Sequence, residues 1–325
     1  MREIDIRPRA LFEEYLRLCA EDTRTYFDSV ERRSIACPAC QSIGKPAFTK
    51  EGFTYELCDT CDSLYVSPRP VAQAFSSYYL TAPSSRFWAT TFYRETAEAR
   101  RRLLWQPKAR AVAAKLASLD AGSHTIVDIG GGYGLFAEEI KALVPHEPLV
   151  VEPAPHLAQV CRDKSLRVLE KFLEDVRPSD LPAGGKAFVS FELFEHLHDP
   201  RLFLARLREL MGRGDIFVFT TLSGTGLDIR LLWDRSKSVS PPHHLNFLNP
   251  RSVTMLLESL GFAAVEVTTP GALDVDILAN NRDALTDRFW RLLIERSDER
   301  QRQQWQRVVA ETGWSSHMMV VCRKS

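Results

Sequence analysis

The stretch Val127-Asp128-Ile129-Gly130-Gly131-Gly132-Tyr133-Gly134 predicts the architecture of most of the chain. Residues 126–129 have the β-branched composition of a short strand, and residues 135–143 have helical composition. The alternating glycines between them let the backbone approach a ligand closely, and the N-terminus of the following helix points at that ligand. The sequence therefore predicts a strand, a glycine turn and a helix that together hold a nucleotide-type cofactor.

The glycine spacing indicates which cofactor this loop suits. A dinucleotide fingerprint that starts at Gly130 requires glycine at position 135, where this chain has Leu135, and no Gly-Lys-Ser/Thr follows to mark a phosphate-binding loop. Asp128 places a carboxylate at the strand end, which would repel a pyrophosphate but suits a ligand that carries ammonium and sulfonium groups. The next strand, 148–151, runs into Glu152, whose carboxylate can accept both hydrogen bonds of a ribose diol.

Two acids at consecutive strand ends, 24 residues apart, resemble motif I and the ribose-binding acid of the class I S-adenosylmethionine (SAM) methyltransferases. The resemblance implies an α/β fold with a doubly wound, Rossmann-like sheet of seven strands. The alternative to a cofactor site is an ordinary glycine turn between a strand and a helix, followed by a glutamate on the protein surface. The family often places an aspartate at the adenine after the third strand, 166–169, and no acid is in register here, so Glu170 or backbone near Phe172 is expected to substitute. The implied SAM-binding residues are Asp128, Gly130, Gly131, Gly132, Tyr133, Gly134, Glu152, Pro153, Phe172, Phe191 and Glu192.

Composition argues against an electrostatically recruited partner. The 325 residues contain 42 Lys and Arg and 42 Asp and Glu, so the chain has no overall basic field for nucleic acid or an anionic membrane. No apolar run approaches the roughly 20 residues of a membrane span, and the first residues do not resemble a signal peptide. We expect a soluble, cytoplasmic protein without a membrane partner. The sequence carries no signal for its oligomeric state.

Four of the seven cysteines form two C-x-x-C pairs separated by 17 residues. In a reducing compartment this spacing predicts a structural zinc ribbon, because four thiolates leave the metal no open position. A redox or disulfide role is the alternative. Residues 47–49 and 54–57 alternate like the strands of a hairpin, with Glu51-Gly52 as the turn. The predicted ligands are Cys37, Cys40, Cys58 and Cys61.

The chain divides into three predicted regions. Residues 1–70 hold an N-terminal helix, expected over 9–27, and the zinc ribbon. Residues 71–120 form a helical, aromatic-rich connector or lid. Residues 121–325 form the SAM-binding domain, whose further strands are expected at 187–191, 215–221, 263–268 and 318–322. Insertions are expected at 222–250 and 278–312.

Candidate catalytic residues follow two of these strands. The segment 192–197 resembles the Glu-His-Leu motif of the superfamily, and a loop rigidified by Pro241 and Pro242 carries the other candidates. We expect this loop on the wall of the crevice opposite His196, with His244 as the general base and His243 orienting it or contacting substrate. His196 could instead cap the helix that begins at Pro200, and the paired histidines could be solvent-exposed. The candidates are Glu195, His196, His243 and His244.

The ribbon, the Pro-Arg-Pro segment 68–70, the connector and the two histidine motifs together resemble bacterial zinc-ribbon methyltransferases of sugar, polysaccharide and secondary-metabolite biosynthesis. The resemblance implies methyl transfer to a hydroxyl or carbon of a small hydroxylated metabolite, with a nucleotide-linked sugar or glycan precursor as the favoured acceptor. The alternatives are a zinc-ribbon RNA methyltransferase and a non-catalytic SAM-binding scaffold. Neutral charge and the absence of the Asn/Asp-Pro-Pro-Tyr/Phe motif weigh against RNA.

Overall fold

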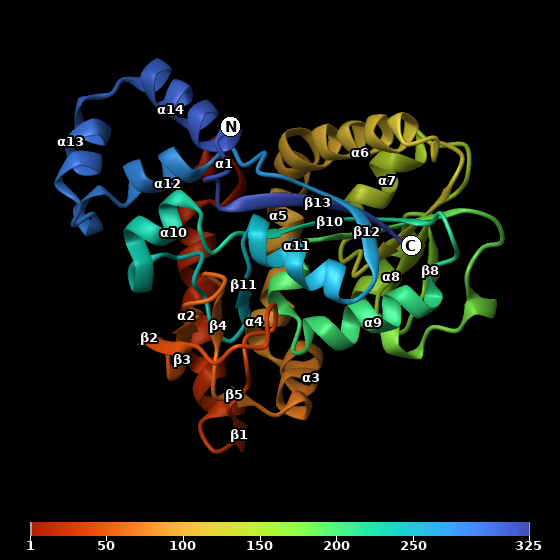
Figure 1. Cartoon of the computed structure of the whole chain (residues 1–325), viewed down its shortest axis with the longest axis horizontal. Coiled ribbons are helices and arrows are strands. Elements are labelled where there is room, and N and C mark those ends of the chain that lie inside the picture. The colour runs from red at the N-terminus through yellow and green to blue at the C-terminus, as the bar shows by residue number, and fades with distance from the viewer. Residues whose placement is uncertain (1, 325) are drawn as a thin grey trace.

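The computed structural model describes residues 2–324 and contains a seven-stranded sheet. Figure 1 shows this sheet with helices packed around it. Its strand order is β12-β13-β10-β9-β6-β7-β8, and all neighbours pair in parallel except β13, which is antiparallel to β10 and β12. From β6 to β8 successive strands are added toward one edge of the sheet, and from β9 onward they are added toward the other edge. Sheets of this kind bind ligands at such a switch point, which here lies between β6 and β9. The strands are β6 Thr125–Ile129, β7 Leu149–Val151, β8 Arg167–Leu169, β9 Lys186–Phe191, β10 Ile216–Leu222, β12 Phe262–Thr268 and β13 His317–Lys324.

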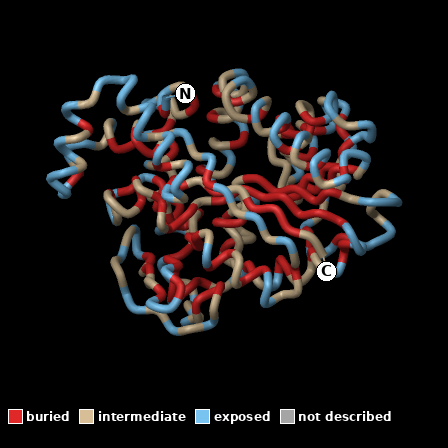
Figure 2. Tube along the Cα trace, turned by 45° about the horizontal axis from the view of Figure 1, so that its top comes forward, coloured by how far each residue is buried: buried red, intermediate tan, exposed pale blue. Residues whose placement is uncertain are grey.

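The central strands are covered on both faces. Every residue of β6 is buried, as are all but the end residues of β9 and β10, and Figure 2 shows these strands as a continuous buried layer. Near-continuous apolar runs are typical of parallel strands packed on two sides. One face packs against α6 Gln106–Ser118 and α7 Leu135–Lys141, and the other against α9 Pro200–Leu210 and α11 Pro250–Ser259. The helix α8 Pro155–Asp163 packs near the β7 edge.

A second sheet joins the cysteine-rich segment to the rest of the chain. Its order is β11-β4-β3-β2, so three strands of the N-terminal region are extended by β11 of the 222–250 insertion, which pairs with β4. The turn between β2 and β3 contains Glu51 and Gly52, both with positive φ, as a tight hairpin requires. The strands are β2 Lys45–Lys50, β3 Phe53–Leu57, β4 Leu64–Val66 and β11 Asn246–Phe247, with a separate pair β1 Arg32–Arg33 and β5 Arg69–Pro70.

Helices connect the two sheets. The expected helix over 9–27 is present as α2, after a short α1. The connector contains two π-helical turns, η1 and η2, between its α-helical parts. These elements are α1 Glu3–Ile6, α2 Arg9–Phe27, α3 Ala72–Thr81, α4 Pro83–Phe87, η1 Trp88–Phe92, α5 Tyr93–Arg100 and η2 Arg101–Trp105.

The remaining helices lie in the insertions and in short turns. The second insertion forms a helical lobe with its own small core, which also includes α10 of the first insertion (Figure 1). Within residues 2–324, no helix combines the length and apolar composition that a membrane crossing requires. The helices are α10 Leu227–Leu232, α12 Asp274–Asn280, α13 Arg288–Arg296 and α14 Glu299–Glu311, and the 3-10 turns are η3 Leu173–Asp175, η4 Pro178–Asp180, η5 Phe194–His196, η6 Trp233–Arg235 and η7 Arg282–Ala284.

Candidate active site

The glycine loop after β6 leaves room for a ligand at one position. Gly130, Gly132 and Gly134 all have positive φ, which side chains rarely adopt. A Cβ on Gly131 would lie 2.6 Å from Val150, so this glycine is required for packing against β7. A Cβ on Gly132 would meet only the Gly130 carbonyl oxygen, at 3.9 Å, so the space beside Gly132 is open. The loop therefore offers backbone and empty space where a cofactor would lie.

Asp128, at the end of β6, is buried, and its Oδ2 has no hydrogen-bond partner among the described residues. Burial, with the nearby Glu152 carboxylate, raises the pKa of Asp128 to about 7. A buried acceptor without a donor is costly, so this position suits a ligand that brings a positive or hydrogen-bonding group. Tyr133 of the same loop packs against Tyr93 of the connector, with ring centroids 5.4 Å apart.

Glu152 lies at the end of β7, beside Asp128, and is held by backbone. Its two carboxylate oxygens accept hydrogen bonds from the N–H groups of Gly132 and Ala154, both at 2.9 Å. Burial raises the pKa of Glu152, and these two N–H groups oppose the rise. Each oxygen keeps a further lone pair, so the carboxylate remains able to accept from a ribose diol. Pro153 follows, half-buried.

Two aromatic candidates occupy different environments. Phe172, after β8, is 43% exposed, which leaves its ring free for an adenine. Phe191 ends β9 and packs in the core, 4.4 Å from Phe136 between ring centroids, so its ring is already covered. Any contact of Phe191 with a cofactor would therefore come through its backbone.

Glu192 is the centre of a polar network that the sequence did not predict. Its Oε1 accepts hydrogen bonds from Lys108 Nζ at 2.9 Å, Thr220 Oγ1 at 2.8 Å and His317 Nε2 at 2.7 Å. Burial would raise the pKa of Glu192, but Lys108 and His317 outweigh it and hold the pKa well below its ordinary value. The carboxylate therefore stays ionised at the switch point of the sheet.

Glu195, His196 and His244 form one cluster. Their ligand atoms lie within 4.8 Å of one another, a donor set that would also suit a divalent ion. Glu195 accepts a 2.7 Å hydrogen bond from Thr221, and burial with the nearby Glu192 charge raises its pKa to about 8. His196 Nδ1 lies 3.3 Å from the Tyr79 hydroxyl, and burial lowers its pKa well below the ordinary value.

His244 has a fixed tautomer. Its Nδ1 lies 2.6 Å from the Ser238 carbonyl oxygen, which can only accept, so Nδ1 carries the proton and Nε2 keeps a lone pair. Burial lowers the pKa of His244 to about 4, with the Ser238 bond opposing the decrease. The imidazole is therefore neutral at neutral pH.

His243 packs edge-on against His196, with ring centroids 5.8 Å apart, and its ring nitrogen contacts the connector. It is buried, and its Nε2 lies 2.6 Å from the Tyr78 hydroxyl and 3.5 Å from Cys19 Sγ. Burial lowers the pKa of His243 to about 3. We expected His243 to orient His244. Among the hydrogen bonds of the described residues, none joins the two rings, so the structure does not support that role. Neither histidine is solvent-exposed.

The expectation that His196 and His244 lie on opposite walls is wrong. Their ring centroids are 4.8 Å apart. Backbone explains this, because Leu245 N donates to the Glu195 carbonyl at 2.8 Å and the Asn246 side chain donates to the Leu197 carbonyl at 2.7 Å. His196 also does not cap α9, since Asp199 accepts from two N–H groups of the first turn.

Arg69 of the Pro-Arg-Pro segment holds the two histidine segments together. This buried side chain donates to the carbonyl oxygens of His198 and Leu245 and to Asn246 Oδ1. The sequence marked the segment as a boundary but gave no sign of this role.

The four predicted zinc ligands converge. Cys37 and Cys61 Sγ are 3.5 Å apart, and Cys40 and Cys58 Sγ are 3.4 Å apart. Tetrahedral zinc with Zn–S bonds of about 2.3 Å brings sulfurs to roughly 3.8 Å, so the cluster fits this metal. Both C-x-x-C pairs form the same turn. The N–H of the first cysteine, Cys37 or Cys58, donates to the carbonyl oxygen five residues later, and the residue before that acceptor, Gln41 or Asp62, has a positive φ.

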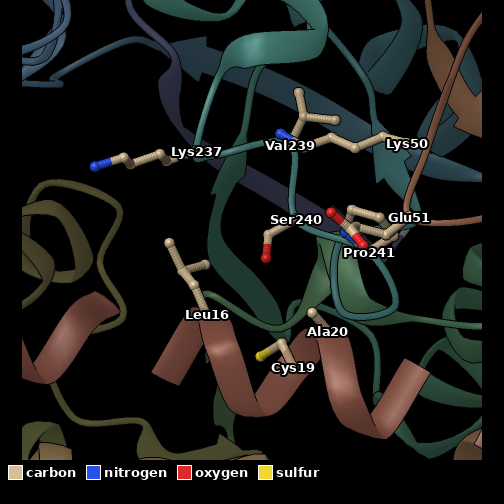
Figure 3. A pocket seen from close by; sticks show the side chains of 9 residues that line it. All are labelled: Leu16, Cys19, Ala20, Lys50, Glu51, Lys237, Val239, Ser240 and Pro241. Carbon is tan, nitrogen blue, oxygen red and sulfur yellow. The ribbon is translucent and has the colours of Figure 1, made fainter. Parts of the chain in front are cut away.

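A small cavity of about 140 Å³ lies between α2 and the loop 237–241, beside the β2–β3 turn. Figure 3 shows the Ser240 side chain directed toward α2, from which Cys19 projects. Cys19 also contacts His243, so the cavity approaches the far side of the histidine loop and not the glycine loop.

Comparisons with known proteins place the chain in a family. A model described as "Methyltransferase domain" matches residues 93–267, more than half of the chain. Similar solved structures include a SAM-dependent methyltransferase from Archaeoglobus fulgidus (18% identity, 71% of this chain and 100% of that chain, TM-score 0.46) and the plantazolicin methyltransferase BpumL with an analogue and SAH (11%, 77% and 94%, TM-score 0.49). Another is a possible histamine N-methyltransferase from Thermotoga maritima (16%, 72% and 98%, TM-score 0.43). No curated protein matches the sequence.

Proposed function

Because this chain belongs to the methyltransferase domain family, we propose that it uses SAM to methylate a hydroxyl or carbon of a small hydroxylated metabolite, with a nucleotide-linked sugar or glycan precursor as the preferred acceptor. Bound SAM would supply a methyl group on a cationic sulfur, and the neutral thioether that leaves needs no general acid. The protein then has to align the acceptor, exclude water and remove one proton.

The residues around the glycine loop would hold the cofactor. Glu152 would accept from the ribose hydroxyls, and the open side of Gly132 would receive the ligand. Asp128 would attract the positive end of the amino-acid tail through its unpartnered oxygen. Phe172 would cover the adenine.

The orientation of His244 is the observation that supports its role as the general base. Its Nδ1–H is committed to Ser238, so its Nε2 lone pair is left available beside Glu195 and His196. A neutral imidazole so fixed can take the proton of a hydroxyl or of a carbon acid next to a carbonyl. Glu195 and His196, which is oriented by Tyr79, would contact the acceptor.

Zinc would be structural in this enzyme. The ribbon sheet includes β11, and Tyr55 of β3 donates to the His244 carbonyl at 2.8 Å. Metal-bound Cys37, Cys40, Cys58 and Cys61 would stabilise the support on which the histidine loop rests.

Transfer of labelled methyl from SAM to a panel of nucleotide sugars and to total RNA tests the function. We expect labelled nucleotide sugar with the wild-type protein and no labelled product with His244→Ala. Transfer to RNA, together with salt-sensitive RNA binding, would contradict the acceptor class. SAM binding without turnover on any acceptor would favour a scaffold.

A further inference from the structure

Three metal-binding side chains converge where two segments of the chain meet. Glu195 and His196 follow β9, and His244 lies in the loop after β10. One carboxylate oxygen and one nitrogen from each imidazole lie within 4.8 Å of one another. Glu195 is buried, whereas the two histidines are only partly buried, so the group keeps contact with solvent. A small ion could therefore reach all three side chains at once.

Each of these side chains is oriented by a further hydrogen bond on its outer side. His244 Nδ1 donates to the Ser238 carbonyl at 2.6 Å, and His196 Nδ1 lies 3.3 Å from the Tyr79 hydroxyl, which can accept from it. Within residues 2–324, no hydrogen bond uses the Nε2 atom of either ring. The Glu195 carboxylate accepts from the Thr221 hydroxyl through one oxygen, at 2.7 Å. Outer contacts of this kind fix the ligands of metal sites in proteins.

The donor types indicate which ions fit. Two imidazoles and one carboxylate suit zinc, nickel, iron and copper, whereas magnesium and calcium prefer oxygen ligands. Tetrahedral bonds of about 2.0 to 2.1 Å bring ligand atoms to roughly 3.3 Å from one another, so small rotations of the side chains would complete the site. Three ligands also leave a coordination position open, unlike the four thiolates of the ribbon. An ion here would therefore be held more weakly and could exchange.

The charges of the cluster also favour a cation. Among residues 2–324, no ion pair engages Glu195, whose side-chain hydrogen bond runs to the neutral Thr221. Lys108, a cation at this end of the sheet, is already paired with Glu192 at 2.9 Å. A buried carboxylate without a cationic partner favours the arrival of a positive ion.

We propose that Glu195, His196 and His244 form a second metal site, which binds a divalent transition-metal ion reversibly and thereby inhibits methyl transfer. Inhibition follows because the ion would occupy the His244 Nε2 lone pair, which the acceptor's proton would otherwise reach. A proton held by the Glu195 carboxyl would be released to solvent when the ion binds. The binding of the ion is independent of the proposed function, and only the inhibition rests on it.

Calorimetry with Ni²⁺ on the zinc-loaded protein tests the site. Metal analysis after the titration should still find one zinc per chain, which separates binding at the new site from exchange at the cysteines. We expect one Ni²⁺ per wild-type chain. Thr221→Val removes the outer contact of Glu195 and should weaken Ni²⁺ binding about 10- to 100-fold, and His196→Gln removes a ligand and should weaken it by more than about 100-fold. His146→Gln, at an exposed histidine, is the control and should bind Ni²⁺ as the wild type does.

Methyl transfer by the wild type should fall in proportion to the Ni²⁺ bound, and a chelator should restore it. Circular dichroism confirms that each variant is folded. Absence of Ni²⁺ binding to the wild type, or equal affinity in folded His196→Gln, would overturn the site. Full turnover with Ni²⁺ bound, or turnover that requires the ion, would overturn the inhibition. Ni²⁺ bound through these residues in a protein that methylates no acceptor would support the site and contradict the proposed function.

Discussion

His196 and His244 lie face to edge, with ring centroids 4.8 Å apart, although they follow different strands of the central sheet. His196 is oriented by Tyr79 of the connector, and His244 is oriented by the Ser238 carbonyl of its own loop. Three regions of the chain thus meet at one pair of imidazoles. Among these groups, His244 has the clearest free lone pair, which is the reason for assigning it as the base.

His244→Ala should lower kcat by ~10²- to 10⁴-fold, the usual contribution of a general base, with SAM affinity nearly unchanged. Steady-state kinetics with calorimetry measures both. His146→Ala, at an exposed histidine, is the control and should keep full activity. Near-normal turnover in His244→Ala, with activity abolished in His196→Ala, would transfer the role of base to His196.

Stability should depend on the protonation of Glu195. Its folded pKa, about 8, lies above the ordinary value because of burial, so the folded state binds the proton more tightly than the unfolded state. The resulting stability is fully present below about pH 4.5 and is lost as pH rises through about 8. Glu195→Gln mimics the neutral acid.

The free energy of unfolding, measured by denaturant titration from pH 5 to pH 9, should therefore rise in Glu195→Gln relative to wild type as pH increases. Glu209→Gln, at an exposed glutamate, provides the control and should show no such trend. A difference between Glu195→Gln and wild type that stays constant across this range would mean that the carboxyl is ionised in the folded protein throughout.

Cys58→Ser should abolish zinc binding and lower the free energy of unfolding by at least about 4 kcal/mol, the size reached when a structural metal is lost. Metal analysis and denaturation measure the two effects. Cys322→Ser changes a buried cysteine outside the cluster and should retain one zinc per chain. A metal-free Cys58→Ser protein that stays folded, binds SAM and specifically loses chemistry would contradict a structural role.

The strands of the central sheet could be predicted from the sequence because each is marked by residues within or next to it. Asp128 and Glu152 mark the ends of two strands, and β-branched runs mark the others within one or two residues. The pairing of β11 with β4 was not predictable, since a two-residue strand has no periodicity of its own. Its register depends on Arg69 and on the ribbon core, which are contacts between distant parts of the chain.

The site was predicted in its residue types more than in its arrangement. The histidine motifs were evident, but Lys108, Thr221 and His317 carry no motif and are found only through the contacts they make with Glu192 and Glu195. The opposite-wall expectation failed because it treated the loop after β10 as independent of the segment after β9. Backbone hydrogen bonds between Leu245 and Glu195 join them.

Binding of S-adenosylhomocysteine (SAH) to the wild-type protein and to Glu152→Ala, measured by calorimetry, tests whether the cofactor binds at the ends of β6 and β7. We expect one SAH per chain, with binding weakened by ~1.5 to 3 kcal/mol in Glu152→Ala through loss of hydrogen bonds to a charged acceptor. Glu147→Ala removes an exposed carboxylate two residues before the start of β7 and should bind SAH as wild type does. Absence of binding to wild type, or equal affinity in Glu152→Ala, would contradict the placement of the cofactor at the ends of β6 and β7.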